Sequence, residues 1–211
     1  MRSCRALGAL LSHPSNDLIA AIDELRAVLA AEGLVDIRPL EPLFASLKDG
    51  DLLDLQDAYF SLFDNTRSLS LHMYEHVWGE ARERGQAMVR LQTVFALHGC
   101  AYDGTELPDY LPLFCEFLSL IAPAAARALL GDAAAVLEVL RARLQRRGSP
   151  YAAVLAALVA LAARKPDPAL LERISKGETP DAETFDEIDR LWAEEPVLFT
   201  PDAGCQPSAA V

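Results

Sequence analysis

The sequence predicts an all-α protein, a single-domain irregular bundle of about eight or nine helices. Apolar residues recur at helical spacing along most of the chain, whereas the alternation typical of strands is nearly absent. Glycine- and proline-containing breaks separate these repeats, and 211 residues with 52% hydrophobic content can bury one core without disulfides or metals. We expect residues 1–195 to form the helical domain and residues 196–211 to form a flexible C-terminal tail.

Seven apolar stripes predict the main helices in chain order. Their members are Leu18, Ile22, Leu25 and Leu29; Leu52, Leu55, Tyr59 and Leu62; Ala87, Met88, Leu91, Val94 and Phe95; Leu113, Phe117 and Leu120; Val136, Leu137, Leu140 and Leu144; Tyr151 to Leu161; and Phe185, Ile188, Leu191 and Trp192.

Residues that favour helix ends flank several of these stripes. Ser15 is placed to cap the first one, Asp109 the one that continues through Phe117, and Thr179-Pro180 the last. Gly148 is a plausible stop for the fifth, whose final turns carry Arg141, Arg143, Arg146 and Arg147, basic residues that complement a helix dipole.

Charge and cysteine content restrict the compartment and the partners. A net charge of -12 and a pI of about 4.7 disfavour binding to nucleic acid or to anionic membrane surfaces. The longest apolar run, Tyr151 to Ala163, is shorter than the about 20 residues that a membrane span needs, and the N-terminus lacks the pattern of a signal peptide. Four widely spaced cysteines are typical of reduced thiols, so we expect a cytoplasmic protein.

One short motif would fit an enzyme. His72-Met73-Tyr74-Glu75-His76 matches His-x-x-Glu-His, in which two histidines on one helical face bind zinc and the glutamate acts as general base. Such a peptidase needs a third ligand that the sequence does not identify. Packing or hydrogen-bonding roles for Glu75 and His76 are the favoured alternative.

Two stretches, Tyr59 to Val89 and Gly104 to Pro112, are not explained by helix packing alone. Within them lie Tyr59 to Asp64, the block from Glu75-His76-Val77 to Met88-Val89 with its Arg84-Gly85-Gln86-Ala87-Met88 centre, and Glu106 to Pro112. Together they resemble the NarJ family of nitrate reductase molybdenum cofactor assembly chaperones, within the TorD-like redox-enzyme maturation proteins. The resemblance extends from the N-terminal helix to Phe199.

The resemblance implies an all-helical chaperone that is not an enzyme. Its client would be the apo catalytic (alpha) subunit of respiratory nitrate reductase, bound through its N-terminal peptide while molybdenum cofactor and iron-sulfur cluster are inserted and membrane docking is delayed. The cofactor would belong to the client, none being bound permanently. Cofactor-delivery proteins are further candidate partners, we expect a monomer, and a helical adaptor for another client is the alternative.

The same stretches supply the residues expected to contact the client. We expect aromatic side chains to provide the contact area of a groove and acidic ones to recognise basic client residues, with Glu106, Asp109 and Tyr110 at the entrance. The full predicted set is Tyr59, Phe63, Asp64, Tyr74, Glu75, His76, Glu80, Arg84, Gln86, Met88, Glu106, Asp109 and Tyr110.

Glu80 and Arg84 can form an i,i+4 pair, and Gly85 within a helix predicts a bend or a close approach of another group. Two departures from the family pattern are His72, where a hydrophobic residue is commoner, and Trp78, where histidine is more usual.

Overall fold

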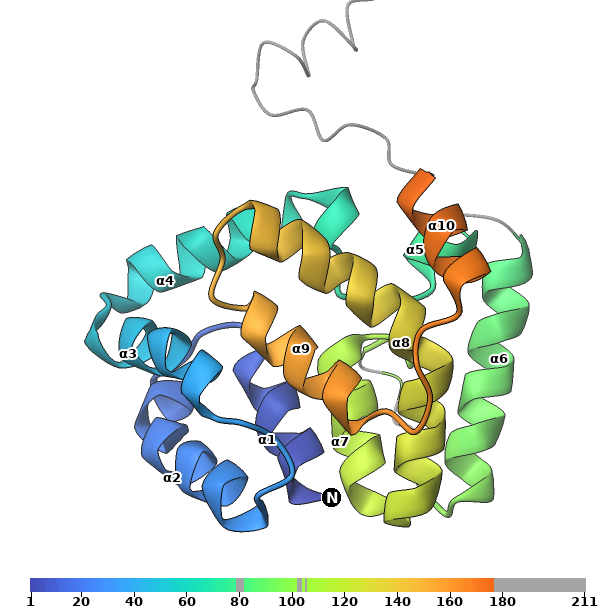
Figure 1. Cartoon of the computed structure of the whole chain (residues 1–211), viewed down its shortest axis with the longest axis horizontal. Helices are drawn as coiled ribbons and strands as arrows, with labels where there is room; N and C mark the ends of the chain where they lie inside the picture. Colours follow the sequence, from blue (N-terminus) through green and yellow to red (C-terminus); the bar gives the residue numbers. More distant parts are fainter. Residues whose placement is uncertain (79–81, 102–103, 105, 177–211) are drawn as a thin grey trace, which may run out of the picture. The chain divides into compact units, whose positions relative to one another are not determined.

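The computed structural model describes residues 1–78, 82–101, 104 and 106–176. These residues form ten α-helices and three short helical turns, and a lone bridge between His72 and Tyr110 is their only strand-like pairing, so the all-α prediction is confirmed (Figure 1). In chain order the elements are α1 (Arg2–Leu10), α2 (Asn16–Glu32), η1 (Arg38–Leu40), α3 (Glu41–Asp49), α4 (Leu52–Tyr59), η2 (Phe60–Asp64), η3 (Arg67–Leu69), α5 (Glu75–Trp78), α6 (Arg82–Leu97), α7 (Leu111–Leu120), α8 (Pro123–Arg146), α9 (Ala152–Leu161) and α10 (Pro168–Lys176).

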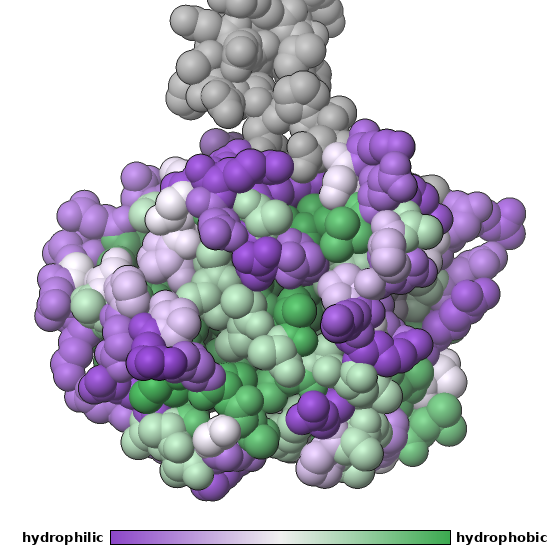
Figure 2. All heavy atoms as spheres, in the orientation of Figure 1, coloured by the Kyte–Doolittle hydropathy of each residue, from purple (hydrophilic) through white to green (hydrophobic). Residues whose placement is uncertain are grey.

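The core is built around α1 and α8. Leu7 and Leu10 of α1 are completely buried between α2 and α7, and a Cβ added at Gly8 would lie 2.6 Å from Cys115 Cβ, so α1 and α7 approach closely there. Leu137 and Leu140 of α8 are completely buried as well, and α8 packs against α9 and α10. On the face seen in Figure 2, apolar side chains gather over α9 and the adjoining part of α8.

Local end signals predict several boundaries correctly. Ser15 caps α2, since its side chain accepts a hydrogen bond from the Leu18 amide at 3.2 Å. Gly148 follows α8 with φ +66°, a conformation that glycine adopts without strain. The helix predicted after Thr179-Pro180 and the tail 196–211 lie outside the described residues.

Three expectations about local structure are wrong. Asp109 does not cap α7, whose N-terminal residue Tyr110 makes no side-chain cap, because the Asp109 carboxylate has other partners. Leu120 is 66% exposed, since α7 buries Leu111, Phe114 and Leu118 instead.

An added Cβ at Gly85 would have no neighbour within 4 Å, so of the two expectations for this glycine the close approach is wrong. Arg143, near the end of α8, is only 6% exposed.

Within the described residues, the cysteines are free thiols. Cys4 and Cys115 are buried free thiols, and burial raises the pKa of Cys4 to about 11. Cys100 is also free. None of the helices in the described ranges has the length and apolar character to cross a bilayer.

Candidate functional site

Two loop segments that are distant in sequence are held together at the start of α5 and of α7. The Met73 amide donates a hydrogen bond to the Asp109 carbonyl at 3.1 Å, and the Leu111 amide donates to the Leu71 carbonyl at 2.9 Å. These bonds flank the His72–Tyr110 bridge. The two motif-rich stretches of the sequence therefore meet in space.

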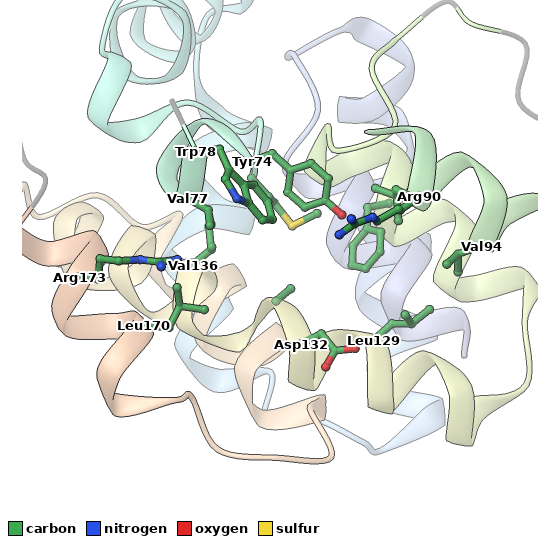
Figure 3. Close-up of a pocket in the computed structure, with 14 residues that line it drawn as sticks. Tyr74, Val77, Trp78, Arg90, Val94, Leu129, Asp132, Val136, Leu170 and Arg173 are labelled. Carbon is green, nitrogen blue, oxygen red and sulfur yellow. The ribbon is translucent and has the colours of Figure 1, made fainter. Parts of the chain in front are cut away.

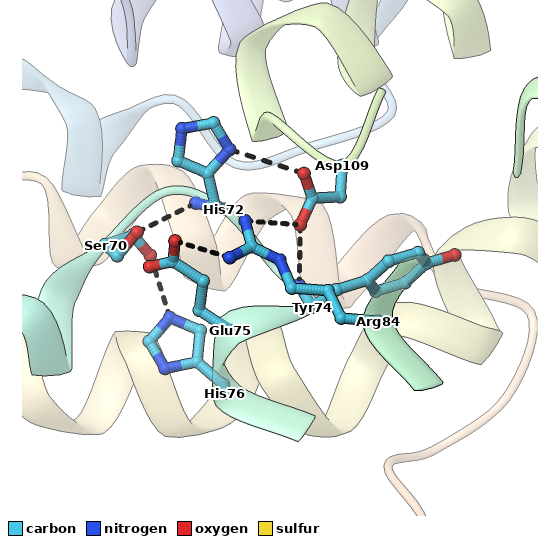
Figure 4. Close-up of polar contacts among 7 residues, drawn as sticks. All are labelled: Ser70, His72, Tyr74, Glu75, His76, Arg84 and Asp109. Atoms are coloured by element: carbon cyan, nitrogen blue, oxygen red, sulfur yellow. Dashed lines mark hydrogen bonds and ion pairs between the residues drawn. The ribbon is translucent and has the colours of Figure 1, made fainter. Parts of the chain in front are cut away.

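Asp109 is the centre of a polar network at this junction (Figure 4). It is completely buried, and its Oδ2 accepts a hydrogen bond from the Tyr74 amide at 3.0 Å. His72 Nδ1 lies 3.3 Å from Oδ1, and Arg84 Nη2 lies 4.0 Å from Oδ2. The hydrogen bond to Asp109 raises the pKa of His72. All of these partners belong to the protein itself.

Arg84 extends the network from α6 to α5. Its Nη1 lies 3.1 Å from Glu75 Oε1, so an ion pair joins the first residue of α5 to the first turn of α6. The expected partner, Glu80, lies outside the described residues. Arg84 thus fixes how α5 and α6 meet, because it contacts both Glu75 and Asp109.

Both ring nitrogens of His76 have hydrogen-bond partners within the protein. Nε2 donates to the Ser70 carbonyl at 2.8 Å, and Nδ1 accepts from Arg143 Nη1 at 3.3 Å. Burial lowers the pKa of His76, which favours the neutral ring that this pattern requires. Arg143 also donates to the Ser68 carbonyl at 2.7 Å and so ties α8 to this loop.

This geometry contradicts the zinc-peptidase interpretation. His72 precedes α5 and therefore shares no helical face with His76, and the two imidazoles have different partners within the protein. Within the described ranges, no group of three or more His, Cys, Asp or Glu side chains is arranged to hold a metal ion.

A pocket of about 390 Å³, called the apolar pocket below, opens on the other side of the same segment (Figure 3). Buried Met73, Leu91, Phe114 and Val136 are among the residues that line it. Trp78 is 36% exposed, and its ring meets the Tyr74 ring edge-on with centroids 4.9 Å apart. The remaining lining residues are Val77, Arg90, Val94, Leu129, Asp132, Ala133, Leu170 and Arg173.

A second pocket, of about 460 Å³, has polar walls. It is lined by Phe63, Asp64, Asn65, Arg67, Ser70, His72 and Glu75. The segment from His72 to Glu75 therefore contributes to both pockets, because Tyr74 lines the apolar one while His72 and Glu75 line the polar one.

The structure divides the predicted client-contact residues among several environments. Tyr59 is buried beside Phe63, with ring centroids 4.9 Å apart, and its hydroxyl donates to the Leu11 carbonyl at 2.8 Å. The Tyr110 hydroxyl lies 3.4 Å from that of Tyr59. Burial raises the pKa of both tyrosines.

The other predicted residues lie elsewhere. Glu75, His76, Arg84 and Asp109 belong to the polar network, and Asp64 lines the polar pocket. Gln86 and Glu106 are exposed, and Met88 is half-buried.

Of the predicted set within the described residues, Tyr74 alone lines the apolar pocket. Sequence reasoning missed the rest of this lining. Leu91 and Val94 had been assigned to the core face of their helix, and nothing in a helical repeat distinguishes a pocket wall from a core position.

Comparison with known proteins decides the family. The model of the nitrate reductase delta subunit family matches residues 14–157 of this chain. The chain belongs to this family. A delta subunit relative from Escherichia coli K12, the nitrate reductase molybdenum cofactor assembly chaperone NarJ, is 39% identical over 207 residues, which cover 95% of this chain and 86% of the relative.

Two further members of the delta subunit family are similar over long stretches. Escherichia coli NarW, named a probable nitrate reductase molybdenum cofactor assembly chaperone, is 34% identical over 96% of this chain and 85% of its own length. The Bacillus subtilis protein with the corresponding NarJ name is 30% identical over 74% of this chain and 85% of its own length. The resemblance inferred from the sequence motifs is therefore confirmed.

Proposed function

We propose that this chain is an assembly chaperone for a respiratory nitrate reductase. It binds the N-terminal segment of the apo catalytic subunit while molybdenum cofactor and iron-sulfur cluster are inserted, and it delays docking of that subunit to the membrane. The three relatives described above carry the names of nitrate reductase molybdenum cofactor assembly chaperones, which supports the client class.

The apolar pocket is the observation that carries the binding mode. Its volume of about 390 Å³ lies within the range of about 300–1,000 Å³ that is typical of ligand-binding pockets. Most of its lining side chains are apolar, so it can take up apolar side chains of a partner. A helix that presents apolar residues at i, i+3 and i+4 would bury them between α6, α8 and α10. Each fully buried Leu or Phe contributes about 1.5–3 kcal/mol before the ordering costs of association are subtracted.

The same proposal covers location and cofactor. The chaperone acts in the cytoplasm as a monomer, and the molybdenum cofactor belongs to the client rather than to this chain. Cofactor-delivery proteins are then transient partners of the complex.

Calorimetric titration with a synthetic peptide of the client's N-terminal segment tests the proposal. We expect one-to-one binding with a Kd in the micromolar range or tighter, about -8 kcal/mol or better. No heat from a folded protein at several temperatures would exclude this client. A helical adaptor for another client would then be the remaining interpretation.

A pair of matched variants on α8 tests the pocket itself. Ala133 lines the apolar pocket and Ala128 is exposed on the same helix outside its lining. Ala133→Phe fills the pocket and should weaken peptide binding at least about tenfold, or about 1.4 kcal/mol, while Ala128→Phe leaves it unchanged. Equal affinities in the two variants, with helicity retained, would place the peptide elsewhere.

A further inference from the structure

The rim of the apolar pocket carries two arginines from different helices. Arg90 belongs to α6 and Arg173 to α10. Figure 3 shows their guanidinium groups pointing inward from opposite sides of the pocket. Among the residues that the structure describes, no ion pair involves either of them.

The third charged residue of the lining is already paired. Asp132 on α8 forms an ion pair with Arg164, which lies outside the pocket lining. The available charge at the rim is therefore positive, although the chain as a whole carries a net charge of -12. Of the two acidic residues predicted at the groove entrance, Asp109 is buried and bonded within the protein, and Glu106 is exposed but does not line the apolar pocket.

We propose that Arg90 and Arg173 select a segment that carries an Asp or Glu beside its apolar face. This inference rests on the proposed function, because it names the chemistry of the segment that the apolar pocket takes. Apolar walls accept any apolar helix face of suitable size, whereas a guanidinium recognises a carboxylate through two parallel hydrogen bonds. The charge contact fixes the register and orientation of the helix, while the apolar face supplies most of the affinity.

Model peptides separate this selection from the identity of the client. We would compare three synthetic amphipathic helices of about 18 residues with one shared Leu/Phe face and a central flanking Glu, Gln or Lys. Their binding to the full chain is measured by fluorescence anisotropy. The Glu peptide should bind about fivefold tighter than the Gln peptide, and the Lys peptide should bind weakest. The preference should shrink at about 0.5 M salt.

Charge reversal supplies the decisive comparison. The double variant Arg90→Glu/Arg173→Glu should invert the order, so that the Lys peptide binds tightest. Arg82→Glu, on the exposed first turn of α6 and outside the pocket lining, is the matched control and should keep the original order. Equal binding of the Glu and Gln peptides, or an unchanged order in the double variant, would overturn the inference.

The nitrate reductase peptide is titrated in parallel. If the model peptides show the acid preference and the client peptide does not bind, the selection stands and the assigned client is wrong. If the client peptide binds and the model peptides show no acid preference, the client stands and the selection is wrong. If none of the four peptides binds, the pocket is not a docking site and both proposals fall.

Discussion

Replacing Asp109 by alanine is expected to destabilise the fold rather than to remove a client contact. The side chain is completely buried and accepts a hydrogen bond from the Tyr74 amide at 3.0 Å. It also lies 3.3 Å from His72 Nδ1 and 4.0 Å from Arg84 Nη2. Alanine would leave the Tyr74 amide without its acceptor and Arg84 with Glu75 as its remaining carboxylate contact in the network.

The magnitude follows from these three contacts. A hydrogen bond to a charged group contributes about 1.5–3 kcal/mol, and the longer contacts with His72 and Arg84 add about 1 kcal/mol together. Relief of the buried carboxylate's desolvation offsets part of this sum. We therefore expect the free energy of unfolding to fall by about 2–4 kcal/mol and Tm to fall by about 5–15 °C.

Urea unfolding followed by circular dichroism measures the change, and Asp57→Ala is the control. Asp57 is exposed on α4, so its replacement should stay within about 0.5 kcal/mol of the wild type. Asp109→Ala with wild-type stability and a tenfold loss of client-peptide affinity would refute the reasoning. Asp109 would then contact the client directly.

Three further perturbations test other parts of the structure. His72 gains a carboxylate partner on folding, which raises its pKa, so its stabilisation is fully present below its unfolded pKa of about 6.5 and is lost as the pH rises through the higher folded pKa. The stability difference between wild type and His72→Asn in urea should therefore shrink from pH 6 to pH 8.5, and a constant difference would contradict the pairing. Gly8→Ala should lower the free energy of unfolding by about 1–3 kcal/mol, because the added Cβ would lie 2.6 Å from Cys115 Cβ. Gly85→Ala, in open space within α6, should raise it by up to about 1 kcal/mol. Thermal unfolding that shifts in the same direction for both variants would contradict this. Arg143→Met should lower the free energy of unfolding by about 1–3 kcal/mol, because a loop carbonyl loses a buried donor, and a change below about 0.5 kcal/mol in urea unfolding would show that this bond contributes little.

Helices whose signals are local were predictable from the sequence. The α2 stripe with its Ser15 cap, the α8 stripe with Gly148 beyond it, and α9 all depend on residues a few positions apart. Helices α1 and α3 were not assigned by the periodicity. Helix α1 packs most extensively against α7, a helix far along the chain that a local repeat does not reveal, whereas α3 packs against the neighbouring α2 and η1.

The role of Asp109 shows why the site was harder to predict than the fold. An aspartate just before an expected helix start is a strong local signal for a cap, but α7 begins at Leu111, two residues after Asp109. Its carboxylate instead binds an amide 35 positions away, and this partner exists only once α5 and α7 have come together. The burial of Arg143 was hidden for the same reason, because the Ser68 carbonyl that accepts its hydrogen bond lies 75 positions away.

Unusual sequence motifs in this chain contribute more to the polar network than to the proposed contact surface. The polar network needs particular residue types at fixed positions, so it produces motifs that stand out in a sequence. The wall of the apolar pocket needs only apolar side chains of suitable size, so Leu91 and Val136 read as ordinary core positions.

Tyr74 connects the two. Its amide is held by Asp109 while its ring lines the apolar pocket. We therefore expect a change in the network to reach the pocket through the position of this ring, so that Asp109→Ala would weaken binding of the proposed client segment although Asp109 itself does not line the pocket.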